Sequence, residues 1–178
     1  MDFVELKELE DGLFEVSYLA NGKMIVTQEL KRKDVVKILI YNRDRDAFIL
    51  TRQFRPFLYV NYPKMANRVE LCGGGVDDGF SDEQAAIKEV LEETGYKVEK
   101  LQKITTLYTV SKMTLYYTEV DDSMRVNSGG GVDEDEDIEV VELPISKAKE
   151  FMFDEFKPKR PALMFTFCWY FNMRSEFN

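Results

Sequence analysis

The sequence contains no histidine among its 178 residues, and it has only two cysteines, Cys72 and Cys168. The absence of histidine excludes Ser-His-Asp and Cys-His triads, histidine-ligated zinc and histidine acid–base chemistry. Two cysteines so far apart form neither a disulfide framework nor a zinc-binding motif. An enzyme built from this sequence must therefore work with carboxylates, lysine, tyrosine or a hard metal ion.

Positive charge is also scarce, because 24 Lys and Arg stand against 33 Asp and Glu, for a formal net charge of -9. Binding to duplex nucleic acid or to anionic membranes needs a basic face, so neither is an expected partner. An acidic chain can instead bind divalent cations, which then attract an anionic substrate. The N-terminal residues lack the apolar stretch of a signal peptide, and no run is as long as a membrane span, so a cytoplasmic location is expected.

Hydrophobic residues make up 44% of the chain and aromatic residues 13%, enough to bury the core of one compact domain. Residues 1–34 predict an antiparallel meander, because strand patterns over 13–19 and 24–30 flank an Asn-Gly turn. Further strand patterns lie at 35–41, 47–52, 68–72, 101–107, 115–120 and 138–143, and helix patterns at 81–94, 146–153 and 161–173. The predicted fold class is α/β, a sandwich with a mixed sheet over residues 35–178 and a small N-terminal antiparallel sheet.

Two segments lack a regular pattern. Residues 53–63 carry aromatic side chains and prolines, so we predict a loop or a strand extension, and residues 121–137 are polar, Gly-rich and acidic, which predicts a loop. Core packing is predicted for Phe57 and Tyr59, with stacking on a base as the alternative. Cys72 has no histidine partner and is predicted to be a small buried residue.

The predicted helix over 81–94 has recognisable start and end signals and several glutamates. Ser81 and Gln84 form a capping-box pattern, and a glycine follows the helix at position 95. At about 100° per residue, Glu89, Glu92 and Glu93 fall within an arc of about 100°, with apolar residues toward the other side. Their mutual repulsion would be relieved by a hard cation such as Mg²⁺. Taken alone, the three glutamates are equally typical of a solvated acidic helix face.

Residues 73–96, GGGVDDGFSDEQAAIKEVLEETGY, resemble the Nudix box, G-x5-E-x7-R-E-U-x-E-E-x-G-U, in which U is bulky and apolar. Gly74 matches the first glycine, and the stretch from Glu89 to Tyr96 matches the end of the motif without a gap. Phe80 and Lys88 depart from it, because they replace a glutamate and an arginine. The resemblance implies an α/β/α sandwich and a hydrolase that uses Mg²⁺, or alternatively Mn²⁺, to activate water against a diphosphate.

The segments QFRP at 53–56, VELCGGGVD at 69–77 and GGGVDEDEDIEVVELP at 129–144 resemble the ADP-sugar pyrophosphatase group, and within it the UDP-sugar (UDP-glucose) pyrophosphatases. In that branch an apolar residue also occurs at the position of Phe80 and a lysine at that of Lys88. The resemblance implies hydrolysis of a UDP-glucose-like nucleoside-diphosphate sugar to a nucleoside monophosphate and a sugar 1-phosphate. The alternatives are ADP-ribose or GDP-mannose as substrate, or a catalytically degenerate, nucleotide-binding Nudix module.

The same resemblance assigns site residues. It implies that the metal ligands are Glu89, Glu93, the backbone carbonyl of Gly73 and Glu136. The implied catalytic residues are Glu134, as the general base or the group that orients the attacking water, and Glu92 in support. For Glu134 and Glu136, the alternative is that they belong to a disordered acidic loop.

The implied substrate-binding residues are basic. Arg55 matches a family arginine that touches the diphosphate or the sugar, and the alternative is a surface arginine paired with an acid. Arg32 and Lys33 belong to a short basic run that reaches toward the phosphates across a dimer, or else forms a solvated hairpin end. Family members dimerise by exchanging N-terminal sheets, so a homodimer formed through residues 1–34 is expected.

Overall fold

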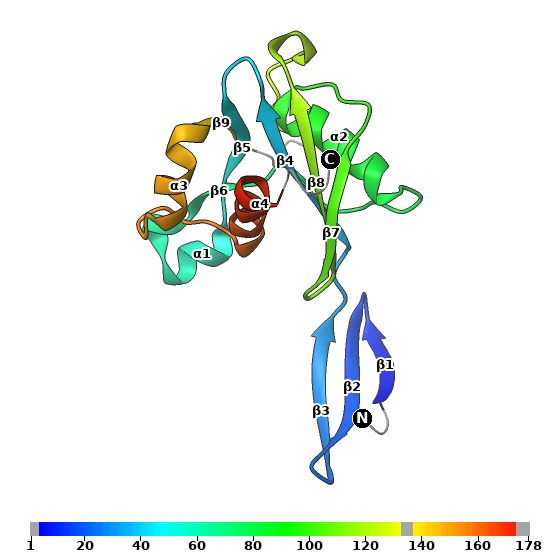
Figure 1. Cartoon of the computed structure of the whole chain (residues 1–178). Coiled ribbons are helices and arrows are strands. Elements are labelled where there is room, and N and C mark those ends of the chain that lie inside the picture. The colour runs from blue at the N-terminus through cyan, green and yellow to red at the C-terminus, as the bar shows by residue number, and fades with distance from the viewer. Residues whose placement is uncertain (1–3, 133–136, 174–178) are drawn as a thin grey trace.

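The computed structural model describes residues 4–132 and 137–173 (Figure 1). Strands β1 (Val4–Glu10), β2 (Leu13–Ala20) and β3 (Lys23–Leu30) form an antiparallel sheet in that order. Asp11 and Asn21 have positive φ at the two turns, each followed by a glycine that also has positive φ. The predicted N-terminal meander is confirmed.

This N-terminal sheet extends away from the body of the molecule (Figure 1). Each of its strands exposes apolar side chains, among them Val4, Leu6, Leu19, Met24 and Val26. Three strands with so few buried residues are a poor independent unit. The boundary that we predict between this segment and the following domain, at residue 34, stays a prediction.

The main sheet contains β4 (Val35–Asn42), β5 (Ala47–Phe54), β6 (Asn67–Glu70), β7 (Gln102–Tyr108), β8 (Lys112–Val120) and β9 (Ile138–Pro144). Its order is β6-β5-β4-β8-β7, with β9 on β5. Strands β4 and β8 run parallel and the other pairs antiparallel, so the sheet is mixed, as predicted.

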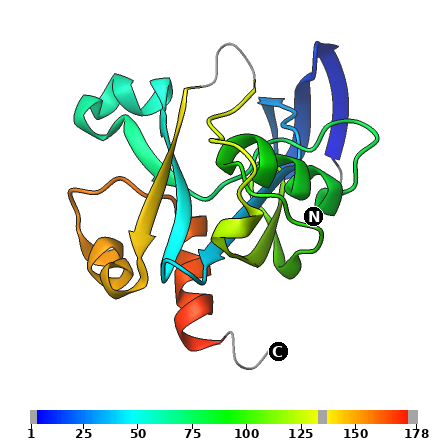
Figure 2. The same ribbon diagram turned by 90° about the horizontal axis from the view of Figure 1, so that it is seen from above.

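Helices cover both faces of this sheet. The helix α2 (Asp82–Thr94) packs on one face, and α3 (Ile145–Phe153) and α4 (Pro161–Asn172) pack on the other (Figure 2). Alternation along β4 supplies both cores, because Val36 and Ile38 face α2 whereas Leu39 faces α4. The α/β/α sandwich is confirmed. No helix in the described part of the chain is long and apolar enough to cross a membrane.

The prediction of a loop or strand extension over 53–63 is wrong in its second half. Strand β5 continues to Phe54, and a short helix α1 (Pro56–Asn61) then begins at a proline, whose fixed φ suits the first helical position. A 3₁₀ turn follows at Pro63–Met65. Core packing of Phe57 and Tyr59 is also wrong, because both are more than half exposed.

The segment from β6 into α2 is the part of the fold that shapes the site. Strand β5 pairs with β4 over 47–49 and with β6 over 51–54, so β4 and β6 occupy successive stretches of β5. The chain after β6 returns to β4, where Ile38 N donates to Cys72 O (2.8 Å) and Val36 N donates to Gly74 O (3.0 Å). The glycine loop is thereby fixed along the start of a core strand. Cys72 is fully buried, as predicted.

Candidate active site

A cavity of about 450 Å³ lies between the glycine loop and the glutamate face of α2. Its lining carries both signs of charge in close proximity. The acidic members are Asp77, Glu89, Glu92 and Glu93, and the basic members are Lys33, Lys37, Arg55, Lys88 and Arg160. The mixture suits a site that must hold cations on one wall and an anion on another.

Local sequence signals set the ends of α2. The Ser81 hydroxyl accepts from Gln84 N (3.2 Å), and the Gln84 side chain accepts from Ser81 N (2.9 Å), so the predicted capping box is formed. Gly95 ends the helix at φ 77°, where a Cβ would also lie 2.2 Å from the carbonyl of Asn127. These local signals therefore fix both ends of the helix that carries the three glutamates.

Glu93 is the buried member of the three glutamates, with 4% of its surface exposed. One of its carboxylate oxygens accepts from Gly73 N (2.7 Å), and the other accepts from the Gln53 amide (3.2 Å). Glu89 lies one turn earlier, and a Cβ on Gly74 would come within 2.5 Å of its carboxylate. The structure thus brings Gly73, Glu89 and Glu93 close together, and Glu89 and Glu92 are only partly exposed. Their roles as metal ligands stay predictions.

Lys88 replaces the arginine of the Nudix box and still lies among acids. Its ammonium is 3.5 Å from Glu92 and 3.7 Å from Asp77, and the charge of Glu92, only partly opposed by burial, raises the pKa of Lys88. Phe80, the other departure from the motif, is about half exposed. The lysine therefore forms an ion pair with Glu92, although it lacks the bidentate geometry of arginine.

Arginines from separate segments surround one buried carboxylate in the described part of the chain. Arg55 donates to both oxygens of Glu70 (2.7 and 2.9 Å), Arg68 donates from Nε (2.8 Å), and Arg160 lies 3.6 Å away. Burial would raise the pKa of Glu70, but the Arg55 hydrogen bonds and the charges of Lys37, Arg55 and Arg68 outweigh it and hold the pKa at about 2. Arg55 is thus paired with an acid, and it lines the cavity as well.

Sequence reasoning missed Lys37 and Arg160. Lys37 is only 6% exposed, and its ammonium donates to the backbone carbonyl of Gly73. A lysine inside the apolar run VVKILIY was a usable signal, because lysine is almost never fully buried without a specific partner. Arg160 precedes the first helical proline of α4, and nothing in its neighbourhood marked it in advance.

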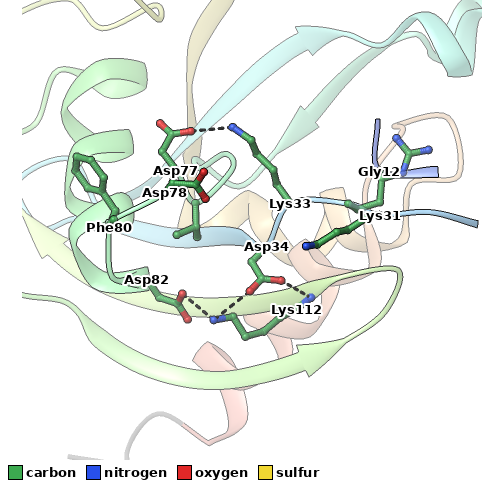
Figure 3. Close-up of a pocket in the computed structure, with 12 residues that line it drawn as sticks. Gly12, Lys31, Lys33, Asp34, Asp77, Asp78, Phe80, Asp82 and Lys112 are labelled. Atoms are coloured by element: carbon green, nitrogen blue, oxygen red, sulfur yellow. Dashed lines mark hydrogen bonds and ion pairs between the residues drawn. The ribbon is translucent and has the colours of Figure 1, made fainter. Parts of the chain in front are cut away.

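Arg32 and Lys33 line a second cavity of about 490 Å³. Figure 3 shows Lys33 in this cavity, with its side chain directed toward Asp77. Lys33 and Asp77 line both cavities and form an ion pair of 3.0 Å across their border. Arg32 lines the second cavity and is absent from the lining of the first. Within one chain, therefore, Lys33 approaches the glutamates and Arg32 does not.

Glu134 and Glu136 lie outside the described residues, so their predicted roles stay predictions. The segment before them is described, and it is attached to the last turn of α2. Gly130 N donates to Glu93 O (2.9 Å) and Gly131 N to Glu92 O (3.1 Å), and Val132 lines the glutamate cavity.

The donor atoms of this site fit a hard divalent cation, because they are carboxylate and carbonyl oxygens. Gly74 leaves the space that the Glu89 carboxylate uses, and the Gly73 carbonyl accepts a hydrogen bond from the Lys37 ammonium. Across residues 4–132 and 137–173, however, no three acidic or cysteine side chains converge as a ready metal cluster. In the described part of the chain, Glu89, Glu92 and Glu93 are the acids of α2 that could hold a metal.

Comparison with known proteins decides the family. Residues 31–163 match the NUDIX domain model. The chain belongs to the Nudix family. It is therefore a Nudix hydrolase, and enzymes of the Nudix family generally use a divalent metal ion such as Mg²⁺.

Curated Nudix relatives share much of the sequence. A GDP-mannose pyrophosphatase of Pectobacterium atrosepticum is 40% identical over 167 residues, which cover 86% of each chain. A GDP-mannose pyrophosphatase of Cronobacter sakazakii is 39% identical over 145 residues, or 70% of this chain and 75% of the relative. A solved structure described as an ADP compounds hydrolase aligns over 87% of this chain and 83% of its own, with a TM-score of 0.65 and 20% identity. That last likeness shows the fold alone.

Proposed function

We propose that the chain hydrolyses the diphosphate linkage of a nucleoside-diphosphate sugar, with GDP-mannose as the substrate. Water adds to one phosphorus, and the products are a nucleoside monophosphate and a sugar 1-phosphate. The observation that carries the proposal is the cavity itself. It is lined by the glutamates of α2 and by Lys33, Arg55 and Arg160 from other segments, which suits a metal-assisted attack on a phosphate-rich substrate.

The choice of GDP-mannose rests on the named relatives. The sequence pattern alone favoured a UDP-glucose-like substrate and kept GDP-mannose as an alternative. The relatives from Pectobacterium and Cronobacter are both named GDP-mannose pyrophosphatase. UDP-glucose is therefore the comparison substrate in the test below.

Each proposed role follows from where the side chain lies. Glu89 and Glu93 hold the divalent ion, and the Gly73 amide and Gln53 keep the Glu93 carboxylate in place. When bound, a divalent ion supplies a more acidic water and neutralises phosphate charge. Glu92, assisted by Lys88, supports the metal-binding face.

The remaining roles concern the water and the diphosphate. Glu134 takes the proton of the attacking water, and Glu136 is a further metal ligand; the glycines before them are bonded to α2 at the cavity. Lys33 and Arg55 bind the diphosphate. The proposed assembly is a homodimer in which the exposed apolar side chains of the N-terminal sheet meet a second copy and Arg32 reaches the partner's substrate.

The test is a panel of nucleotide sugars with Mg²⁺, in which the monophosphate and the sugar 1-phosphate are identified as products. We expect kcat/KM for GDP-mannose to exceed that for UDP-glucose by at least tenfold, about 1.4 kcal/mol of discrimination. Glu93→Gln should lower kcat by at least about 100-fold. Glu83→Gln, an exposed first-turn residue of the same helix, should leave it unchanged.

Full activity in Glu93→Gln would refute the metal role. Tight binding of GDP-mannose to the wild type in Mg²⁺ without any turnover would instead favour the degenerate, nucleotide-binding alternative. A higher kcat/KM for UDP-glucose than for GDP-mannose would restore the substrate that the sequence pattern favoured.

A further inference from the structure

Lys37 is a charged side chain in a position where the fold otherwise places apolar ones. It lies on β4 between Val36 and Ile38, both fully buried. It lines a small, mainly apolar gap together with Leu71, Met113, Ala162, Leu163 and Arg160. Burying an ammonium costs free energy unless a polar partner compensates it. The partner in the structure is the Gly73 carbonyl, and Lys37 also helps to lower the pKa of Glu70.

Gly73 is held so that its carbonyl stays with Lys37. Its φ of 128° is open only to glycine without strain, and a Cβ would lie 2.2 Å from the carbonyl of Val36. The residues on either side of it, Cys72 and Gly74, are bonded to the β4 backbone. Its own amide is bonded to Glu93. The carbonyl therefore has little freedom to turn toward another cation.

The same carbonyl is the atom that the Nudix resemblance assigns to a metal ion. An ammonium in hydrogen-bond contact with it and a divalent ion coordinated to it would repel each other strongly at so short a separation. The two cations therefore compete for one oxygen. Burial of Lys37 and the fixed backbone of Gly73 both favour the ammonium.

We propose that the Lys37 ammonium replaces a divalent ion at the Gly73 carbonyl, so that this chain binds its metal through the α2 glutamates without Gly73. Lys37 then acts as a built-in cation that weakens divalent-ion binding in the cavity and limits the number of ions held. This inference rests on the proposed metal-dependent function, and it concerns binding rather than turnover.

The experiment measures Mn²⁺ affinity and stoichiometry without substrate, by calorimetry and by the EPR signal of free Mn²⁺. The variants are Lys37→Met and Lys37→Gln, and the matched control is Lys33→Met, which removes the same charge from the exposed rim of the same cavity. We expect either Lys37 variant to bind Mn²⁺ more than about tenfold more tightly, or to bind an additional ion. The control should change the affinity by no more than a few-fold, because its charge is more distant and screened.

Two variants are used because one substitution at a buried site can fail to fold, and urea unfolding of each shows which is folded. An unchanged or weaker Mn²⁺ affinity in a folded Lys37 variant overturns the inference. An equal gain in Lys33→Met also overturns it, because the effect is then one of net charge alone. If neither the wild type nor the variants bind Mn²⁺, the proposed metal-dependent function fails together with this inference. If the wild type binds Mn²⁺ and a folded Lys37 variant binds it no more tightly, only this inference fails.

Discussion

Replacing Glu70 by glutamine removes a buried negative charge from the centre of a cluster of arginines, of which Arg68 is buried and Arg55 and Arg160 are partly exposed. Glu70 is 1% exposed, and it accepts hydrogen bonds from Arg55 and Arg68 while Arg160 lies 3.6 Å away. A neutral amide leaves these guanidinium groups without a counter-charge. Breaking a buried ion pair by removing one partner costs about 3–5 kcal/mol.

The pKa of Glu70 gives a second measure of the same quantity. A fall from the ordinary value of 4.5 to about 2 corresponds to about 3 kcal/mol of stabilisation at neutral pH. Because the folded-state pKa is depressed, this contribution is complete above the unfolded value and is lost as pH falls through the folded value. The difference between wild type and Glu70→Gln should therefore shrink by about 1.4 kcal/mol per pH unit between about 4.5 and 2.

The assay is urea unfolding of both proteins at pH 7, 6 and 3, values that avoid the pI of about 4.7. Glu142→Gln is the control, since Glu142 pairs with Arg45 at the exposed edge of β9 and should contribute less than about 1 kcal/mol. A loss below about 1 kcal/mol for Glu70→Gln at pH 7, or a loss of equal size at pH 3, would refute the reasoning.

Further predictions address the glycine loop, the helix cap and the N-terminal sheet. Gly74→Ala should weaken Mn²⁺ binding by about 10–100-fold, because the added Cβ displaces the Glu89 carboxylate. The free energy of unfolding should change by less than about 1 kcal/mol, and an unchanged Mn²⁺ affinity would contradict this prediction. Ser81→Ala should cost about 1 kcal/mol in urea unfolding and leave kcat unchanged, since only the exposed cap is lost; a stability equal to that of the wild type would argue against the cap. Light scattering should find a dimer, and Val26→Asp, on the exposed apolar sheet, should dissociate it; a wild-type monomer would be decisive against the exchange of sheets.

Much of the fold was predictable because its signals are local. The capping box of Ser81 and Gln84, the terminal glycine of α2 and the Asn-Gly turn each act within a few residues, and the structure confirms them. The short helix after β5 was missed, because a proline at its first position is equally typical of a loop. The exposure of Phe57 was missed because aromatic content says nothing about where a segment lies relative to the core.

The candidate site was predictable in its residue types and less so in its geometry. The spacing of Glu89, Glu92 and Glu93 placed them on one helical face, but it could not show that Glu93 alone would be buried. That distinction arises because the Gly73 amide and the Gln53 side chain approach it from other segments.

The sequence by itself therefore determined the family, the glutamate helix and the class of chemistry, since each depends on residues close together in the chain. Only the tertiary structure decided which basic side chains contact which carbonyl and carboxylate oxygens. Lys37 and Gly73 are 36 positions apart, and Arg160 reaches Glu70 from the start of α4. Such contacts depend on how β4, the glycine loop and α4 pack together, and that packing is not encoded in any short stretch of sequence.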